Sequence, residues 1–96
     1  GGTTIEDNTN FLAQVQWVSG SEVSRTANCS YSGYSYATCP SGTIIITGEC
    51  EQISSYNGIN NSTTEVSNNR HYCRAYSCSN NLATVRARAL CMQKTP

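Results

Sequence analysis

Charge is scarce in this 96-residue chain. It has six Lys plus Arg and six Asp plus Glu, which leaves a formal net charge of zero at pH 7 with histidine neutral. Nucleic-acid-binding proteins usually carry a clustered excess of Lys and Arg, so we set nucleic-acid partners aside. Neutral polar residues stand in place of charged ones, because 13 Ser, 11 Thr and 10 Asn make up 34 of the 96 residues. Their short side chains offer many hydrogen-bond donors and acceptors.

Long apolar runs are also missing. A membrane-spanning helix needs about 20 consecutive apolar residues, and no segment approaches that length. We therefore expect no direct membrane insertion. The longest apolar run, residues 43–47, predicts a buried strand. The chain opens on Gly1-Gly2 without Met, and we interpret it as a mature or excised fragment whose export signal lies upstream.

Metal-ligand patterns are absent as well. The chain has one histidine, His71, and no Cys-x-x-Cys pair, since even Cys73 and Cys78 are separated by four residues. Zinc sites usually present closely spaced pairs of ligands. We therefore expect no metal ion and no other cofactor.

Few residues could support catalysis. His71 is the only candidate general base at neutral pH, and nothing resembles a nucleophile elbow. Glu49 and Glu51 would lie about 6–7 Å apart on one face of a strand, a spacing that could serve a glycosidase. If Cys50 points inward, however, both glutamates simply face water. We predict that the protein is not an enzyme.

Cysteine, by contrast, is abundant. An even number of cysteines in a short chain is typical of exported domains, whose small cores need disulfides. Each disulfide that closes a loop of tens of residues adds about 3–4 kcal/mol of stability in the chain-entropy model. We predict three disulfides and an extracellular protein. The six positions are Cys29, Cys39, Cys50, Cys73, Cys78 and Cys91.

Alternating apolar and polar residues predict strands near the amino terminus. Residues 11–18 alternate with a period of two, which favours a half-buried strand with Trp17 in the core beside Phe11 and Val15. A turn signal at residues 19–21 and a second alternation over 23–29 predict that the two segments form a hairpin.

Three further strands are predicted. Residues 43–47 form the central strand, residues 70–77 another, and residues 84–91 the last, with Val85, Ala87, Ala89 and Cys91 on one face. Residues 30–37 form an aromatic loop or irregular strand, and residues 54–69 a long polar loop with room for one short strand. The prediction is a small all-β domain over 11–96, a disulfide-stapled antiparallel sheet or sandwich-like fold with long polar loops. Residues 1–10 form a polar linker or arm.

Four cysteine-containing motifs carry a resemblance to a known family. They are Cys39-Pro40-Ser41-Gly42, Gly48-Glu49-Cys50, His71-Tyr72-Cys73 and Ala89-Leu90-Cys91. Residues 37–91 resemble the cysteine-rich module at the C-termini of bacterial surface-tip proteins, including the shufflon-encoded minor pilins of thin type IV conjugative pili. The resemblance implies a pilus-tip adhesin that recognises surface glycan, notably lipopolysaccharide, and that follows an upstream pilin-like or stalk domain.

The cysteines allow fifteen disulfide pairings. Residues 43–47 and 84–90 are the best strand patterns, and pairing them antiparallel with Ile44 near Arg86 would bring position 39 beside 91. Cys50, at the other end of its strand, then needs a partner from residues 70–78. We predict Cys39–Cys91, Cys50–Cys73 and Cys29–Cys78.

The module offers no sugar ligands to transfer, so the candidate binding residues come from chemistry. Sugars pack their C–H faces on aromatic rings and pair their hydroxyls with polar side chains, while Arg and His can meet phosphate or acidic sugars. About half of the tyrosines could instead pack inward. The candidates are Tyr31, Tyr34, Tyr36, Tyr56, Asn57, Asn60, Asn61, Arg70, His71 and Arg74.

We therefore expect a non-enzymatic tip domain that binds glycan on a recipient or host cell. A phage or bacteriocin receptor-binding tip would use the same chemistry. A secreted protease inhibitor or toxin is the alternative from another class, and would need an exposed, rigid loop. A purely structural tip cap would bind no glycan.

Overall fold

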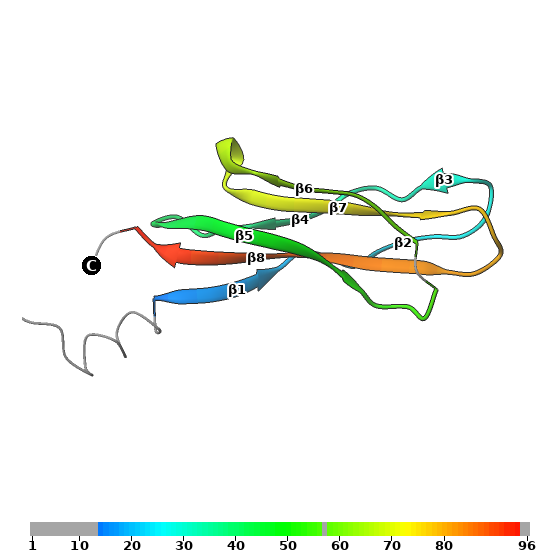
Figure 1. The fold of residues 1–96 in the computed structure, drawn as a ribbon, viewed down its shortest axis with the longest axis horizontal. Helices are drawn as coiled ribbons and strands as arrows, with labels where there is room; N and C mark the ends of the chain where they lie inside the picture. Colours follow the sequence, from blue (N-terminus) through cyan, green and yellow to red (C-terminus); the bar gives the residue numbers. More distant parts are fainter. Residues whose placement is uncertain (1–13, 57, 95–96) are drawn as a thin grey trace, which may run out of the picture.

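Two antiparallel sheets lie face to face in the computed structural model, which describes residues 14–56 and 58–94 (Figure 1). In the first sheet, β8 (Ala83–Gln93) is the central strand, and β5 (Thr43–Gln52) pairs along one side of it. The other side of β8 pairs with β1 (Val15–Ser19) and then with β2 (Val23–Arg25). The expectation that residues 43–47 form the central strand is therefore wrong, because β5 lies at an edge of its sheet.

The second sheet is built around β7 (Arg70–Ser77). β6 (Ile59–Glu65) pairs along one side, and the short strands β3 (Ser30–Tyr31) and β4 (Ser35–Thr38) pair along the other. Apart from one 3-10 turn at Val66–Asn68, the described residues contain no helix, and none that could cross a membrane. The predicted all-β, disulfide-stapled fold is confirmed.

The inner faces follow the period of two in the central strands. The inner residues of β8 are fully buried, as its alternation predicted: Val85, Ala87, Ala89 and Cys91. Those of β7 are buried against them: His71, Cys73, Ala75 and Ser77. Because neighbouring residues of a strand point to opposite faces, every second residue of β7 must lie on the outer surface of the second sheet.

Most of the inner side chains are small. Five of the ten buried apolar residues are alanines and three are cysteines. Burial contributes about 0.8 kcal/mol per CH₂ group, against about 1.5–3 kcal/mol for a whole Val or Leu side chain, so this core gives limited hydrophobic stabilisation. Disulfides, typically worth about 2–4 kcal/mol each, supply a correspondingly large share of the stability.

The predicted disulfide pairing is confirmed. Cys39–Cys91 and Cys50–Cys73 each join the first sheet to the second, while Cys29–Cys78 closes the end of the β3–β7 pair. The register behind the prediction is wrong, however, because Ile44 lies opposite Met92 and not Arg86. Cys39 thus reaches Cys91 across the space between the sheets and not along one sheet.

The predicted amino-terminal hairpin does not form. β1 and β2 pair with successive parts of β8, and the Gly20 N–H between them donates to the Ala87 carbonyl at 2.9 Å. The two strands therefore form one interrupted edge. Gly20 is required there, because a Cβ at this position would overlap the carbonyl oxygen of Tyr36 in the second sheet.

Some predicted core residues lie outside. Trp17 is 43% exposed, and Ile44 and Ile46 are 41% and 49% exposed, so the expectations of a core tryptophan and a wholly buried strand are wrong. In a two-layer fold only one face of each strand is covered, and Val18 and Ile45 take the covered positions. Phe11, predicted to accompany Trp17, lies outside the described residues.

The predicted long loop over residues 54–69 is mostly structured. Residues 59–65 form β6, and the turn that follows ends at Asn69 in the left-handed conformation. The Asn69 amide donates to the Thr43 carbonyl and accepts from the Ile45 N–H, each at 2.8 Å, which ties the start of β7 to the edge of β5. The sequence of β6 has no alternation of apolar and polar residues, so it gave no strand signal. The strand forms because its backbone pairs with β7.

All six cysteines should be oxidised within the chain. In unfolded but unreduced protein, thiol titration should find no reactive thiol, and peptide mapping should recover the three pairs above. Two or more free thiols, or a peptide linking Cys39 to Cys50, would contradict the structure.

Gly48→Ala should destabilise the domain by about 2 kcal/mol, the usual cost of overpacking a filled interior. A Cβ at Gly48 would overlap the ring of His71, which lies between the sheets. Gly33→Ala is the matched control, because open space surrounds that position, and its stability should be unchanged or slightly raised. Guanidinium denaturation measures both, and equal effects would show that the interior accepts the extra methyl group.

Candidate functional site

The outer face of the second sheet gathers tyrosine and arginine. Residues 70–77 alternate, so that the four residues between the buried ones point outward: Arg70, Tyr72, Arg74 and Tyr76. Strands on both sides of β7 support these residues, which makes their row the centre of the face. We call the row and its tyrosine neighbours from residues 30–38 the tyrosine–arginine face.

Three more tyrosines extend the face on the side of β3 and β4. Tyr31 lies directly opposite Tyr76, with ring centroids 4.9 Å apart, and Tyr36 lies opposite Tyr72 at 5.8 Å. Tyr34 sits between them and meets Tyr72 edge to face at 5.1 Å. Pairs of aromatic rings at such distances attract one another, so Tyr31 and Tyr76 hold each other in position, and so do Tyr34, Tyr36 and Tyr72.

The segment that carries Tyr34 is held against β7 by Ser32. The Ser32 N–H donates to the Ala75 carbonyl at 2.8 Å, and the Ser32 hydroxyl accepts from the Ala75 N–H at 2.9 Å. The side chain thus replaces a missing strand contact between β3 and β4. Tyr34 therefore has a defined place although it lies outside both strands.

Both arginines stack on these rings. The Arg70 guanidinium lies 4.3 Å from the centroid of Tyr36, and that of Arg74 lies 3.6 Å from Tyr31 and 4.8 Å from Tyr34. A guanidinium over an aromatic face is attracted by the ring quadrupole and loses little hydration. Both cations are thereby held against the tyrosine rings.

β6 provides polar neighbours on the other side of β7. Glu65 lies opposite Arg70 and accepts from its Nε at 2.6 Å, and Thr63 lies opposite Tyr72. The Asn61 carboxamide, oriented with its oxygen toward Arg74, accepts from the Arg74 Nη2 at 2.6 Å and from its Nε at 3.0 Å. Hydrogen bonds from Asn68 and then Arg70 lower the pKa of the Glu65 carboxyl below its ordinary value, which keeps that residue ionised.

Six of the ten candidate residues belong together. The structure places Tyr31, Tyr34, Tyr36, Asn61, Arg70 and Arg74 on or beside this face. Tyr72 and Tyr76 at its centre, and Thr63 and Glu65 at its edge, were not predicted from the sequence. The alternation within residues 70–77 was the signal that could have found the two tyrosines.

The other candidates lie elsewhere. Tyr56 packs against the hydrophobic core, and its backbone carbonyl accepts a hydrogen bond from the Gln52 side chain. Asn57 lies outside the described residues, and so does the side chain of Asn60. His71 is only 4% exposed and occupies the inner face of β7, so its assignment to an exposed ligand set is wrong.

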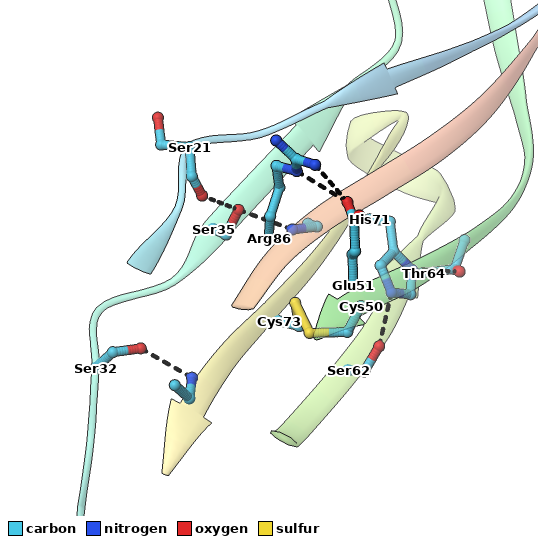
Figure 2. The surroundings of a disulfide bond; sticks show 12 residues. Ser21, Ser32, Ser35, Cys50, Glu51, Ser62, Thr64, His71, Cys73 and Arg86 are labelled. Carbon is cyan, nitrogen blue, oxygen red and sulfur yellow. Dashed lines mark hydrogen bonds and ion pairs between the residues drawn. A yellow bond between two sulfur atoms is a disulfide. The ribbon is translucent and has the colours of Figure 1, made fainter. Parts of the chain in front are cut away.

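His71 is a satisfied interior histidine. Its Nε2 lies 2.7 Å from the Ser62 hydroxyl and its Nδ1 lies 2.8 Å from the Thr64 hydroxyl, beside the Cys50–Cys73 disulfide (Figure 2). A hydroxyl can donate or accept, so either neutral tautomer has both ring nitrogens bonded. Burial lowers the pKa of His71 from its ordinary value, and the nearby Glu49 carboxylate opposes this shift.

The outer face of the first sheet has a different character. Glu49 and Glu51 point outward as predicted, and each pairs with an arginine of β8, Arg88 at 3.0 Å and Arg86 at 2.6 Å. Arg88 also lies over the ring of Trp17 at 4.6 Å. The glutamates on this face are thus paired, and three exposed apolar residues, Trp17, Ile44 and Ile46, lie toward the end of the sheet where β1 and β5 begin.

The described residues show no pocket and no cluster of His, Cys, Asp or Glu that could hold a metal ion. The arrangement with the most distinctive chemistry in that part of the chain is therefore an open surface of rings and guanidinium groups. Such a surface suits a ligand that lies along the sheet.

Stability should fall as the pH decreases from 7.5 to 5.5. The native pKa of His71 lies below the unfolded value of about 6.5, so the unfolded chain binds the proton more readily in this range. One proton changes the free energy of unfolding by at most about 1.4 kcal/mol per pH unit. The pKa of Glu65 is also lowered, so its stabilising effect is constant at higher pH and is lost only as the pH falls below the ordinary value of 4.5. That change lies outside this window.

Urea denaturation of the wild type and of His71→Gln at pH 7.5 and 5.5 measures this effect. The variant should lose most of the pH dependence, while near-ultraviolet circular dichroism checks that it is folded. An equal loss of stability in both proteins would contradict the assignment to His71.

Comparisons of the chain with protein-family models, with curated proteins and with solved structures found no match. The likeness to the pilus-tip module rests on the four short cysteine motifs within residues 37–91.

Proposed function

We propose that this protein is a non-enzymatic adhesin or receptor-binding tip domain that binds glycan, such as lipopolysaccharide, on the surface of a recipient or host cell. The observation that carries the proposal is the tyrosine–arginine face, with five rings and two guanidinium groups on one side of a disulfide-stapled sheet. An open surface of aromatic rings beside hydrogen-bonding groups matches a sugar chain, which has C–H faces and a rim of hydroxyls.

The exposure of the tyrosines supports a binding role. Tyr31, Tyr34 and Tyr36 are 40%, 36% and 44% exposed, and all three lie on one face. Contiguous exposed apolar groups on a small protein are typical of interaction sites. Tyrosine is also suited to such a site because its ring is rigid and its hydroxyl remains a hydrogen-bonding group.

The rings are already ordered before a ligand arrives. Ring-to-ring contacts fix Tyr34 against Tyr72, and Arg74 lies over Tyr31 and Tyr34. Binding then costs little additional side-chain entropy, which a ligand that makes weak individual contacts requires. Three disulfides and a small all-β fold are compatible with an extracellular protein. Its place at a pilus tip is part of the proposal.

A structural role in an appendage is the second candidate, and the first sheet supports it. Trp17, Ile44 and Ile46 are exposed apolar residues at the end of that sheet where β1 begins. An upstream stalk or pilin-like domain of the same chain would enter beside these residues and could cover them. This role is compatible with glycan binding, because the two surfaces lie on opposite sheets.

Tyr34→Ala and Tyr36→Ala should each weaken binding to whole recipient cells and to purified lipopolysaccharide by roughly 5- to 30-fold. The factor corresponds to the 1–2 kcal/mol that truncating a contact in a small site costs. Trp17→Ser is the matched control, since it removes an exposed aromatic residue from the opposite sheet, and it should bind as the wild type does.

Loss of binding in Trp17→Ser with normal binding in both tyrosine variants would assign the ligand to the first sheet. If the wild type binds no glycan on an array of glycans and lipopolysaccharides, the adhesin proposal fails. Inhibition of common proteases by the wild type would then favour the inhibitor alternative.

A further inference from the structure

The two arginines of the tyrosine–arginine face differ in charge balance. Arg70 forms an ion pair with Glu65 at 2.6 Å. Among the residues that the structure describes, no carboxylate lies within 4 Å of the Arg74 guanidinium, whose polar partner is the neutral amide of Asn61. Within the described part of the chain, the face therefore has one cation without a counterion, at Arg74.

The Arg74 guanidinium is also held in a fixed orientation. Asn61 accepts from its Nε and Nη2, and the rings of Tyr31 and Tyr34 lie against it at 3.6 and 4.8 Å. A guanidinium has five N–H donors, so the two bonds to Asn61 leave three for a ligand. The remaining edge, which includes Nη1, has the geometry that binds phosphate or carboxylate oxygens.

We propose that the glycan bound by this face carries an acidic substituent, a phosphate or a carboxylate, and that Arg74 binds that group while sugar rings pack along the tyrosines. This inference rests on the proposed function and adds the class of ligand. It also predicts how the ligand is oriented, with its acidic group at Arg74 and neutral sugar toward Arg70. Arg70 lies four residues along β7, about 13 Å away, and its charge is already paired with Glu65.

A uniformly charged polymer fits this face less well. A nucleic acid presents one phosphate per nucleotide, and its binding depends on neutralising several of them. The face has a single arginine without a carboxylate partner among the described residues, and the whole chain has a net charge of zero. One acidic group followed by neutral sugar matches this distribution better.

The test compares two lipopolysaccharide samples, one untreated and one chemically dephosphorylated, for binding to the purified wild type and to Arg74→Gln. Two controls separate local from general charge effects. Lys94→Gln changes the net charge equally, at an exposed residue after β8, and the double variant Arg70→Gln/Glu65→Gln removes the neutral pair on the same face. Polygalacturonate and its methyl ester provide the corresponding pair of probes for carboxylates, and oligothymidylate is included as a polyanion.

We expect Arg74→Gln to weaken binding to untreated lipopolysaccharide by roughly tenfold. Dephosphorylation should weaken the wild type by a similar factor and leave Arg74→Gln almost unchanged, so that the variant and the treatment are not additive. Lys94→Gln should bind within twofold of the wild type, and the double variant should keep its sensitivity to dephosphorylation. The same pattern with polygalacturonate and its ester would identify a carboxylate as the acidic group.

Two results would overturn the inference and leave the proposed function standing. If Arg74→Gln weakens binding to the treated and untreated samples equally, Arg74 only positions Tyr31 and Tyr34. If the wild type binds dephosphorylated lipopolysaccharide and esterified polygalacturonate as well as the acidic forms, the ligand is neutral. Tight, Arg74-dependent binding of oligothymidylate alone would favour a nucleic acid, and no binding to any sugar probe would refute the proposed function itself.

Discussion

The structure depends on the contact between the inner faces of β7 and β8. Alanine, serine and cysteine dominate this contact, so it buries little apolar surface, and the Cys39–Cys91 and Cys50–Cys73 disulfides join the two sheets across it. Covalent links compensate for a weak core because they reduce the conformational freedom of the unfolded chain. Gly48 and His71 fit together in the same layer, which leaves no room for a larger side chain there.

The packing between the two sheets also determines how firmly the outward side chains of β7 are held. Because β7 is covalently tied to the first sheet and paired on both edges, its outward residues Arg70, Tyr72, Arg74 and Tyr76 lie on a rigid support. Side chains on a strand in the centre of a sheet are positioned more accurately than those on a loop. Recognition by an open face of this kind requires no pocket, and it suits an extended ligand whose individual contacts are weak.

The sparse charges are arranged with more order than the composition suggests. Arg86 and Arg88 pair with glutamates on the first sheet, and Arg70 pairs with Glu65 on the second. On the outer face of the second sheet, the net charge of zero therefore conceals the guanidinium of Arg74, whose polar neighbour in the described part of the chain is an amide. Charges farther away than the Debye length of about 8 Å are largely screened. A bound ligand therefore responds to the local charge around Arg74 and not to the net charge of the chain.

The sequence by itself determined the all-β class, the presence of disulfides and the buried face of β8, because cysteine content and a period of two are local properties. The pairing of the cysteines was predicted correctly, but from a strand register that the structure does not have. It also indicated six of the residues that meet on or beside the tyrosine–arginine face, from their chemistry alone. Only the tertiary structure decided that Trp17 and Ile44 lie outside, that His71 lies inside, and that β1 and β2 follow one another along β8. Alternation defines two faces of a strand but not which of them is covered. The neighbours of each outward residue also come from strand pairing, as where Tyr72 lies opposite Tyr36, 36 residues earlier in the chain. Such choices depend on strand register, and register is set by contacts between residues that are far apart in the sequence.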